Sequence, residues 1–213
     1  MSYTPSQLAV LSGLRSPLKA KPMPAEITAI DVNTSGSGHN QAVVTLAPLE
    51  KGVKQESLAL RLYVSKPDDA IAANPQALGR VKSKGYGFFR AVDKAFPTYP
   101  EKCSDGVWHV YRTKDGATLD FNAYNALCKQ VTEAIFERLT TMTKDSLAPF
   151  VGTKVFMKPQ EATLDEEHRS SQFVQWVSGE LEDGQEFITE DLVDEDKLKE
   201  MIAKATGTES ANA

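Results

Sequence analysis

The sequence has few cysteines and no long apolar run. Its 213 residues include two cysteines, Cys103 and Cys128, which form no Cys-x-x-Cys pair. Two cysteines cannot build a disulfide framework and suit a reducing compartment. No stretch approaches the roughly 18 to 20 apolar residues that cross a bilayer, and residues 1–17 lack the layout of a signal peptide. We therefore expect a cytoplasmic protein with free thiols and no membrane partner.

Motifs of common enzyme classes are also lacking. The sequence contains no Walker loop, HExxH, Gly-x-Ser-x-Gly or Cys–His metal spacing, and its three histidines share no motif. We therefore expect no enzyme activity and no cofactor. A metal-dependent nuclease stays open as the weaker alternative, because loop carboxylates could hold Mg²⁺ together with Asp31 or Asp120. These carboxylates are Glu161, Asp165, Glu166 and Glu167.

The charge is distributed unevenly along the chain. The formal net charge is -5, yet residues 1–158 hold 20 Lys and Arg against 14 Asp and Glu, whereas residues 159–213 hold 4 against 15. Within the basic part, residues 51–94 contain 9 basic and 4 acidic side chains. A local positive field attracts a polyanion whatever the overall pI. A charged surface that is merely solvated is the other interpretation.

Alternating segments predict a β-sheet. Residues 27–32 and 42–46 flank a turn-rich loop and predict a hairpin. In residues 58–64 the leucines and Val64 must share one face, which leaves Arg61 and Tyr63 on the other. Two later strands are predicted at 153–158 and 172–177. In the first of these, a cationic and aromatic set points away from Val155 and Met157, namely Lys154, Phe156 and Lys158.

Residues 67–150 predict an insertion of helices and a hairpin. Three glycines interrupt residues 76–96, which favours two short helices around a flexible segment. Residues 107–112 and 117–121 predict a second hairpin across the turn at Gly116. A long helix follows, because apolar residues recur at helical spacing, with Asn122 as N-cap and Pro149 bounding its far end.

Basic and aromatic side chains together suit a single-stranded nucleic acid. Unstacked bases need flat partners, worth about 1 to 3 kcal/mol each, and the phosphates need Lys or Arg. The densest cluster is residues 82–90, whose stretch 84–88 resembles the longer ribonucleoprotein motif of the RNA-recognition domain. Residues 62–65 resemble the shorter motif of that family. The two stretches lie too close in sequence to leave room for the helix and strand that the family places between them. We therefore interpret residues 82–90 as a flexible loop or helix edge.

The candidate nucleic-acid-binding residues combine this cluster with the two strand faces and a basic loop. For each aromatic member, packing in the core is the alternative role. The candidates are Lys51, Lys54, Arg61, Tyr63, Lys82, Lys84, Tyr86, Phe88, Arg90, Lys154, Phe156 and Lys158.

Three strands, a helical connection and two further strands are the layout of an OB-fold barrel. Together with the acidic tail at residues 180–213, this layout resembles the single-stranded DNA-binding proteins of tailed bacteriophages. The resemblance implies an α+β, mainly β chain whose five-stranded barrel has a large helical and hairpin insertion between the third and fourth strands. The implied parts are a flexible arm (1–25), the OB-fold domain (26–179, insertion 67–150) and an acidic tail (180–213).

The same resemblance implies a function without turnover. Such proteins coat single-stranded DNA with little sequence preference during replication, recombination and repair, here in the cytoplasm of the host cell. The implied groove uses the third and fourth strands with the loops at 35–40 and 161–169. Partners would be single-stranded DNA and, through the tail, replication or recombination proteins, and a homo-oligomer stays open. The tail could instead compete for the DNA site or only solubilise the chain. A protein-interaction or scaffold domain without nucleic acid is the alternative function.

Overall fold

The chain contains both α-helices and β-strands, arranged in two compact units. Unit 1 comprises Met1–Ile30, Val43–Arg61 and Phe150–Ala213, and unit 2 comprises Asp31–Ala42 and Leu62–Pro149. No helix in the described part of the chain is long and apolar enough to cross a membrane. The computed structural model describes residues 14, 16–35, 38, 40–49, 57–63, 73–104, 109–166, 170–181 and 186–207.

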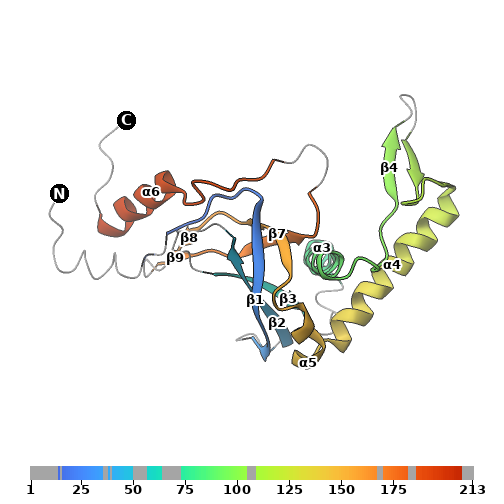
Figure 1. The fold of residues 1–213 in the computed structure, drawn as a ribbon, viewed down its shortest axis with the longest axis horizontal. Coiled ribbons are helices and arrows are strands. Elements are labelled where there is room, and N and C mark those ends of the chain that lie inside the picture. The colour runs from blue at the N-terminus through green and yellow to red at the C-terminus, as the bar shows by residue number, and fades with distance from the viewer. Residues whose placement is uncertain are drawn as a thin grey trace. The chain divides into compact units, whose positions relative to one another are not determined.

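The largest sheet is antiparallel and has five strands, most of which belong to unit 1 (Figure 1). The expected number of strands in this sheet is confirmed, since it takes three strands from before the insertion and two, β7 and β10, from after it. The sheet is not closed into the expected barrel, because among the described residues only an isolated parallel bridge, between Ala59 and Phe173, links β3 to the residue before β10. In spatial order the strands are β10 (Val174–Ser178), β7 (Lys154–Pro159), β1 (Met23–Thr34), β2 (Asn40–Pro48) and β3 (Leu58–Tyr63).

The sheet buries alternate residues on one face. In β3 the predicted alternation is confirmed for the leucines, which are buried, while Arg61 is exposed and Tyr63 is half-buried. Val64 lies outside the described residues. Every other strand adds inward apolar side chains to the same core. Among them are Ile27, Val44, Leu46, Val155, Met157, Val174 and Val177.

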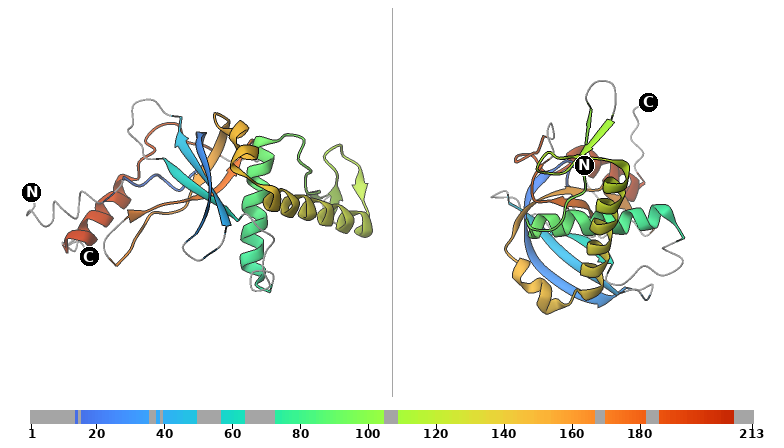
Figure 2. Two further views of the ribbon diagram at one scale, coloured as in Figure 1. Left: turned by 90° about the horizontal axis from the view of Figure 1, so that it is seen from below. Right: turned by 90° about the vertical axis from the view of Figure 1, so that its right-hand side faces the viewer.

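The insertion differs from its prediction at residues 76–96, which form one helix, α3 (Pro75–Val92). The glycines do not break it. A Cβ added at Gly85 would lie 3.0 Å from Ile135 Cγ2, so the glycine allows α3 to approach α4 (Phe121–Thr141) closely. In Figure 1 α3 is seen end-on while α4 runs across the view, and Figure 2 shows the same crossing from below. Of the two alternatives for residues 82–90, a flexible loop or a helix edge, the structure shows the helix.

The other elements of the insertion agree more closely with the sequence. The predicted hairpin is present as β5 and β6, and β4 adds a third strand that was not expected. The N-cap of α4 is Asp120 rather than Asn122, because the Asp120 carboxylate accepts a hydrogen bond from the Ala123 backbone N–H at 2.8 Å. The helix ends at Thr141, well before Pro149. The remaining bounds are β4 (Glu101–Ser104), β5 (His109–Arg112), β6 (Thr118–Leu119), α5 (Lys144–Leu147) and the 3-10 helix η1 (Ala148–Phe150).

The described parts of the expected arm and acidic tail pack against each other in unit 1. Leu18 pairs with Val193 in an antiparallel bridge, and the Lys19 backbone N–H donates to the Leu192 carbonyl at 2.8 Å. The Leu192 side chain is buried, and β1 begins at Met23, inside the predicted arm. The tail also contains a helix, α6 (Glu195–Thr206). Two short strands, β8 (Thr163–Leu164) and β9 (Ser170–Ser171), form a hairpin between β7 and β10.

The close approach of α3 and α4 makes a prediction about stability. Gly85→Leu should lower the free energy of unfolding of unit 2 by roughly 1 to 3 kcal/mol, since it forces a side chain into a packed contact. Gly79→Leu is the matched control, because no atom of a described residue lies within 4 Å of an added Cβ there and leucine favours a helix over glycine. Urea unfolding measures both variants. Equal stabilities would contradict a close helix contact at Gly85.

Candidate nucleic-acid interface

The outer face of β7 carries the predicted cationic and aromatic side chains. Val155 and Met157 are buried, so Lys154, Phe156 and Lys158 point to the other face, where Lys154 is exposed and the other two are half-buried. No ion pair or hydrogen bond joins either lysine amino group to a described residue. Phosphate oxygens would therefore not have to displace a described partner.

A β-bulge in β10 adds a ring to this face. Strict alternation would place Trp176 inside with Val174, yet Val174 and Val177 are both buried. The register between β10 and β7 shifts between Val174 and Trp176, which lets both valines face the core. Trp176 is half-buried and lies opposite Lys158. The bulge thus sets an indole next to a cation.

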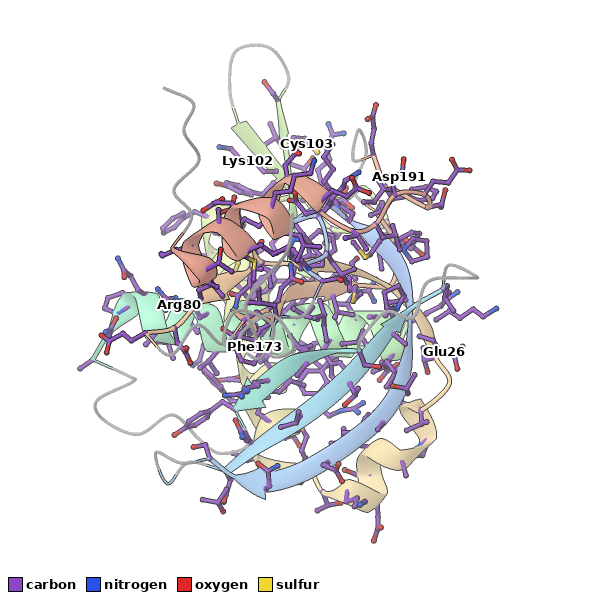
Figure 3. All side chains as sticks on the ribbon, turned by 90° about the vertical axis from the view of Figure 1, so that its left-hand side faces the viewer. Glu26, Arg80, Lys102, Cys103, Phe173 and Asp191 are labelled. Carbon is purple, nitrogen blue, oxygen red and sulfur yellow. The ribbon has the colours of Figure 1, made fainter. Side chains whose placement is uncertain are left out.

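The seam between β3 and β10 holds a second pairing of this kind. The Arg61 guanidinium carbon lies 4.5 Å from the centre of the Phe173 ring, in a cation–π contact. The contact lies next to the parallel bridge between Ala59 and Phe173, which fixes the two strand ends. Figure 3 labels Phe173. Arg61, predicted from alternation, is therefore held by a ring that the sequence analysis did not select.

Acidic side chains reduce the positive potential of this face. Glu26 on β1 pairs in register with Lys154, and both alternate on the same side of the sheet. The acidic segment contributes to the same face, because the Phe187 ring packs against Phe156 with 5.4 Å between ring centres. Phe187 is 49% exposed. Because Glu186 and Glu190 flank it, an aromatic ring with neighbouring carboxylates covers part of the Phe156 surface.

The remaining described candidates belong to unit 2, and the structure gives several of them other roles. Phe88 is wholly buried, so the prediction that it offers a ring to bases is wrong. Arg90 donates hydrogen bonds from Nη1 to the carbonyls of Lys94 and Phe96, which closes the C-terminal end of α3. Lys82 lies over the Phe136 ring at 5.9 Å, and Lys84 and Tyr63 are half-buried.

Tyr86 belongs to a tyrosine cluster along α4. Its ring lies 4.8 Å from that of Tyr99, and its hydroxyl accepts a hydrogen bond from the Tyr99 backbone N–H at 3.3 Å. Burial raises the pKa of Tyr99, against the opposing effect of its hydrogen bond with the Thr132 hydroxyl. Tyr86 therefore ties segments of unit 2 together and is a weaker candidate for stacking than the rings of unit 1.

Unit 2 also carries exposed cations on α3 and β4 that no described acid pairs with, namely Arg80 and Lys102 (Figure 3). Two further candidates, Lys51 and Lys54, lie outside the described residues, as does Glu167 of the carboxylate group. Within the described ranges, no three His, Cys, Asp or Glu side chains lie close enough to hold a metal ion. Asp31 instead forms an ion pair with Lys144 at 3.0 Å.

Sequence reasoning missed three rings that the structure brings to the unit 1 face. Phe173 lies just before β10, where alternation alone does not fix its side. Strict alternation assigns Trp176 to the buried side of the strand, and the bulge places it on the outer face instead. Phe187 belongs to the acidic segment, which was interpreted from its charge alone, and its ring contacts Phe156. For Phe173 and Trp176 the available signal was their place in the predicted strand at 172–177.

No protein-family model matches the sequence, and no curated protein matches it closely enough to indicate a relative.

The Arg61–Phe173 contact predicts a measurable coupling. Arg61→Met and Phe173→Leu, made singly and together, should give a coupling energy of roughly 0.5 to 1 kcal/mol in the free energy of unfolding, as for a partly exposed cation–π pair. Lys154→Met combined with Phe173→Leu is the control and should be additive. Additivity in the Arg61 cycle as well would show that the contact does not form in solution.

Proposed function

We propose that the chain binds single-stranded DNA with little sequence preference and protects it during replication, recombination and repair. The observation that carries this proposal is the outer face of unit 1, where rings and cations stand side by side. The rings would stack on bases and the cations would neutralise phosphates. The face comprises Phe156, Phe173 and Trp176 with Arg61, Lys154 and Lys158.

The strand order of the large sheet supports the same proposal, which includes an OB-fold. The strand order β10-β7-β1-β2-β3, together with a parallel bridge from β3 to the start of β10, is the order expected of a five-stranded OB-fold barrel whose last seam is barely paired. OB-folds commonly bind nucleic-acid strands across their outer strands and loops. The likeness to bacteriophage single-stranded DNA-binding proteins, and a cytoplasmic role without turnover, are parts of this proposal.

Stacking and phosphate contacts account for tolerance of sequence. Every base has an aromatic face, so a ring such as Trp176 stacks on any of them. Lys154 and Lys158 would contact phosphates, which carry no sequence information. Binding of this kind therefore depends on the bases being unpaired and not on their sequence.

Two other functions lead to different observations. A scaffold domain would use the same face for a protein and would not bind an oligonucleotide. A nuclease would need a bound metal, and the carboxylates at Glu161, Asp165 and Glu166 are all exposed.

Titration with oligothymidine at low and moderate salt tests the function. The fluorescence of Trp176, isolated by Trp108→Phe, should be quenched as bases stack on it, and the affinity should fall as salt rises. Absence of binding at low salt would remove the proposal and favour the scaffold. Loss of the oligonucleotide only when Mg²⁺ is present would favour the nuclease.

The salt dependence should identify the cations. Replacing both β7 lysines, Lys154→Gln with Lys158→Gln, should reduce the slope of log affinity against log salt by about 1.4, since each phosphate contact on a single strand contributes about 0.7. Lys102→Gln with Lys114→Gln, two exposed lysines of the small sheet in unit 2, is the matched control. An unchanged slope in the β7 variant would place the phosphates elsewhere.

The Phe187–Phe156 contact predicts that the acidic segment competes with DNA. Phe187→Ala should tighten oligothymidine binding roughly 2- to 10-fold, because an aromatic pair is worth about 0.5 to 1.5 kcal/mol. The point substitution is sharper than removal of residues 180–213, which would also take away the buried Leu192. Phe121→Ala, at a ring that is 77% exposed in unit 2, is the control. Equal affinities of the Phe187 variant and the unaltered chain would reject competition at this ring.

A further inference from the structure

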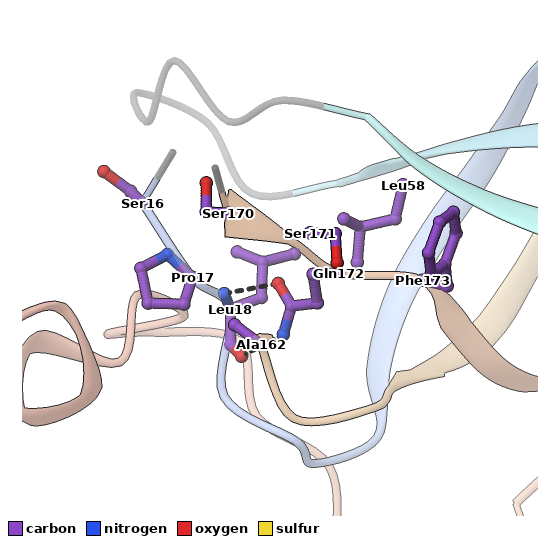
Figure 4. Close-up of a pocket in the computed structure, with 9 residues that line it drawn as sticks. All are labelled: Ser16, Pro17, Leu18, Leu58, Ala162, Ser170, Ser171, Gln172 and Phe173. Atoms are coloured by element: carbon purple, nitrogen blue, oxygen red, sulfur yellow. Dashed lines mark hydrogen bonds between the residues drawn. The ribbon is translucent and has the colours of Figure 1, made fainter. Parts of the chain in front are cut away.

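A pocket opens beside the Arg61–Phe173 contact in unit 1. It has a volume of about 250 Å³ and lies where the first residues of β3 meet the segment that leads into β10 (Figure 4). Phe173 forms one wall and is also the ring beneath the Arg61 guanidinium. The pocket is therefore one side chain away from a cation on the proposed DNA face. Its lining includes Leu18, Leu58, Ala162, Ser170, Ser171 and Phe173.

The walls of the pocket are fixed by hydrogen bonds. The Gln172 amide accepts from the Leu18 backbone N–H at 2.9 Å and donates to the Leu18 carbonyl at 2.7 Å. The same amide donates to the Gln160 carbonyl at 2.8 Å. The hydroxyls of Ser171 and Thr163 share a hydrogen bond at 3.1 Å across the β8–β9 hairpin. The amide thus links three segments, which would hold the cavity in shape before a ligand arrives.

The chemistry of the lining suits a flat, uncharged ring with polar edges. Leu18, Leu58 and Phe173 supply apolar surface, and no described lining residue is ionisable. The volume lies below the roughly 300 to 1,000 Å³ of pockets for drug-sized ligands, so it fits a single ring system rather than a whole nucleotide. A hydroxyl such as that of Ser171 can donate or accept, so it can meet the edge of any base.

We propose that this pocket takes one unstacked nucleobase of the bound strand while an adjacent phosphate lies on Arg61. The inference rests on the proposed function and extends it, because it adds an enclosed base subsite to an open stacking face. Arg61 supplies the positive charge that the pocket lacks, and Phe173 serves both sides, as a pocket wall and as the support of the guanidinium.

Filling the pocket tests the inference. Ala162 is buried and lines the cavity, so Ala162→Leu should occupy the space of the base and weaken oligothymidine binding about 5- to 150-fold, the effect of losing one stacked base. Ala126→Leu, on an exposed face of α4 in unit 2, is the matched control and should bind as the unaltered chain does. Ser171→Val narrows the pocket from its exposed rim and gives a second variant if Ala162→Leu unfolds, which thermal melting would reveal.

A second readout separates the pocket from the rest of the face. In saturation-transfer NMR with thymidine monophosphate, base protons should receive more saturation than sugar protons, and the difference should disappear in the pocket-filling variants. If the unaltered chain binds no oligothymidine, the proposed function itself fails. If it binds and the filled variants bind equally well, the function stands and the base subsite is wrong, as it would be if the pocket received a side chain of a protein partner.

Discussion

Burial of alternate side chains from five strands in a single core determines which groups unit 1 presents on its outer face. Each inward leucine or valine turns its neighbours in sequence outward, because side chains alternate along a strand. Arg61, Lys154 and Lys158 face out for this reason, and their charges need not be desolvated on folding. The face proposed to bind DNA is thus a by-product of a core that would form without any ligand.

The bulge in β10 breaks that alternation next to Lys158. Val174 and Val177 both stay in the core, and the extra residue between them releases Trp176 to the side of Lys158. A bulge interrupts the hydrogen-bond ladder and re-aims a side chain. The seam to β3, where the described residues form one bridge at Phe173, lies just before the same strand. The added ring and the sparsely paired seam therefore lie close together along the chain, and Phe173 at the seam also lines the pocket.

Local periodicity accounts for what the sequence predicted correctly. The faces of residues 58–63 and 154–158 follow from a two-residue repeat and needed no tertiary information. The glycines of α3 led to the wrong prediction of two short helices. Gly85 is required by the close contact with Ile135, some fifty residues away, and does not mark a turn. Phe88 is a core residue because α3 continues through it and turns its ring inward. Nothing local could place Phe187 on Phe156, because backbone hydrogen bonds between the acidic segment and the N-terminal segment hold it there.

The attachment of the acidic segment sets how it would compete with a DNA strand. It is held by buried Leu192 and by backbone hydrogen bonds, such as that from the Ile188 N–H to the Pro22 carbonyl at 2.9 Å, none of which uses the Phe187 ring. The ring is therefore kept near Phe156 at high effective concentration even when it is displaced. A single base gains too little from one stack to displace it. A longer strand also gains phosphate contacts at Lys154 and Lys158, so competition by Phe187 would favour extended single strands over isolated nucleotides.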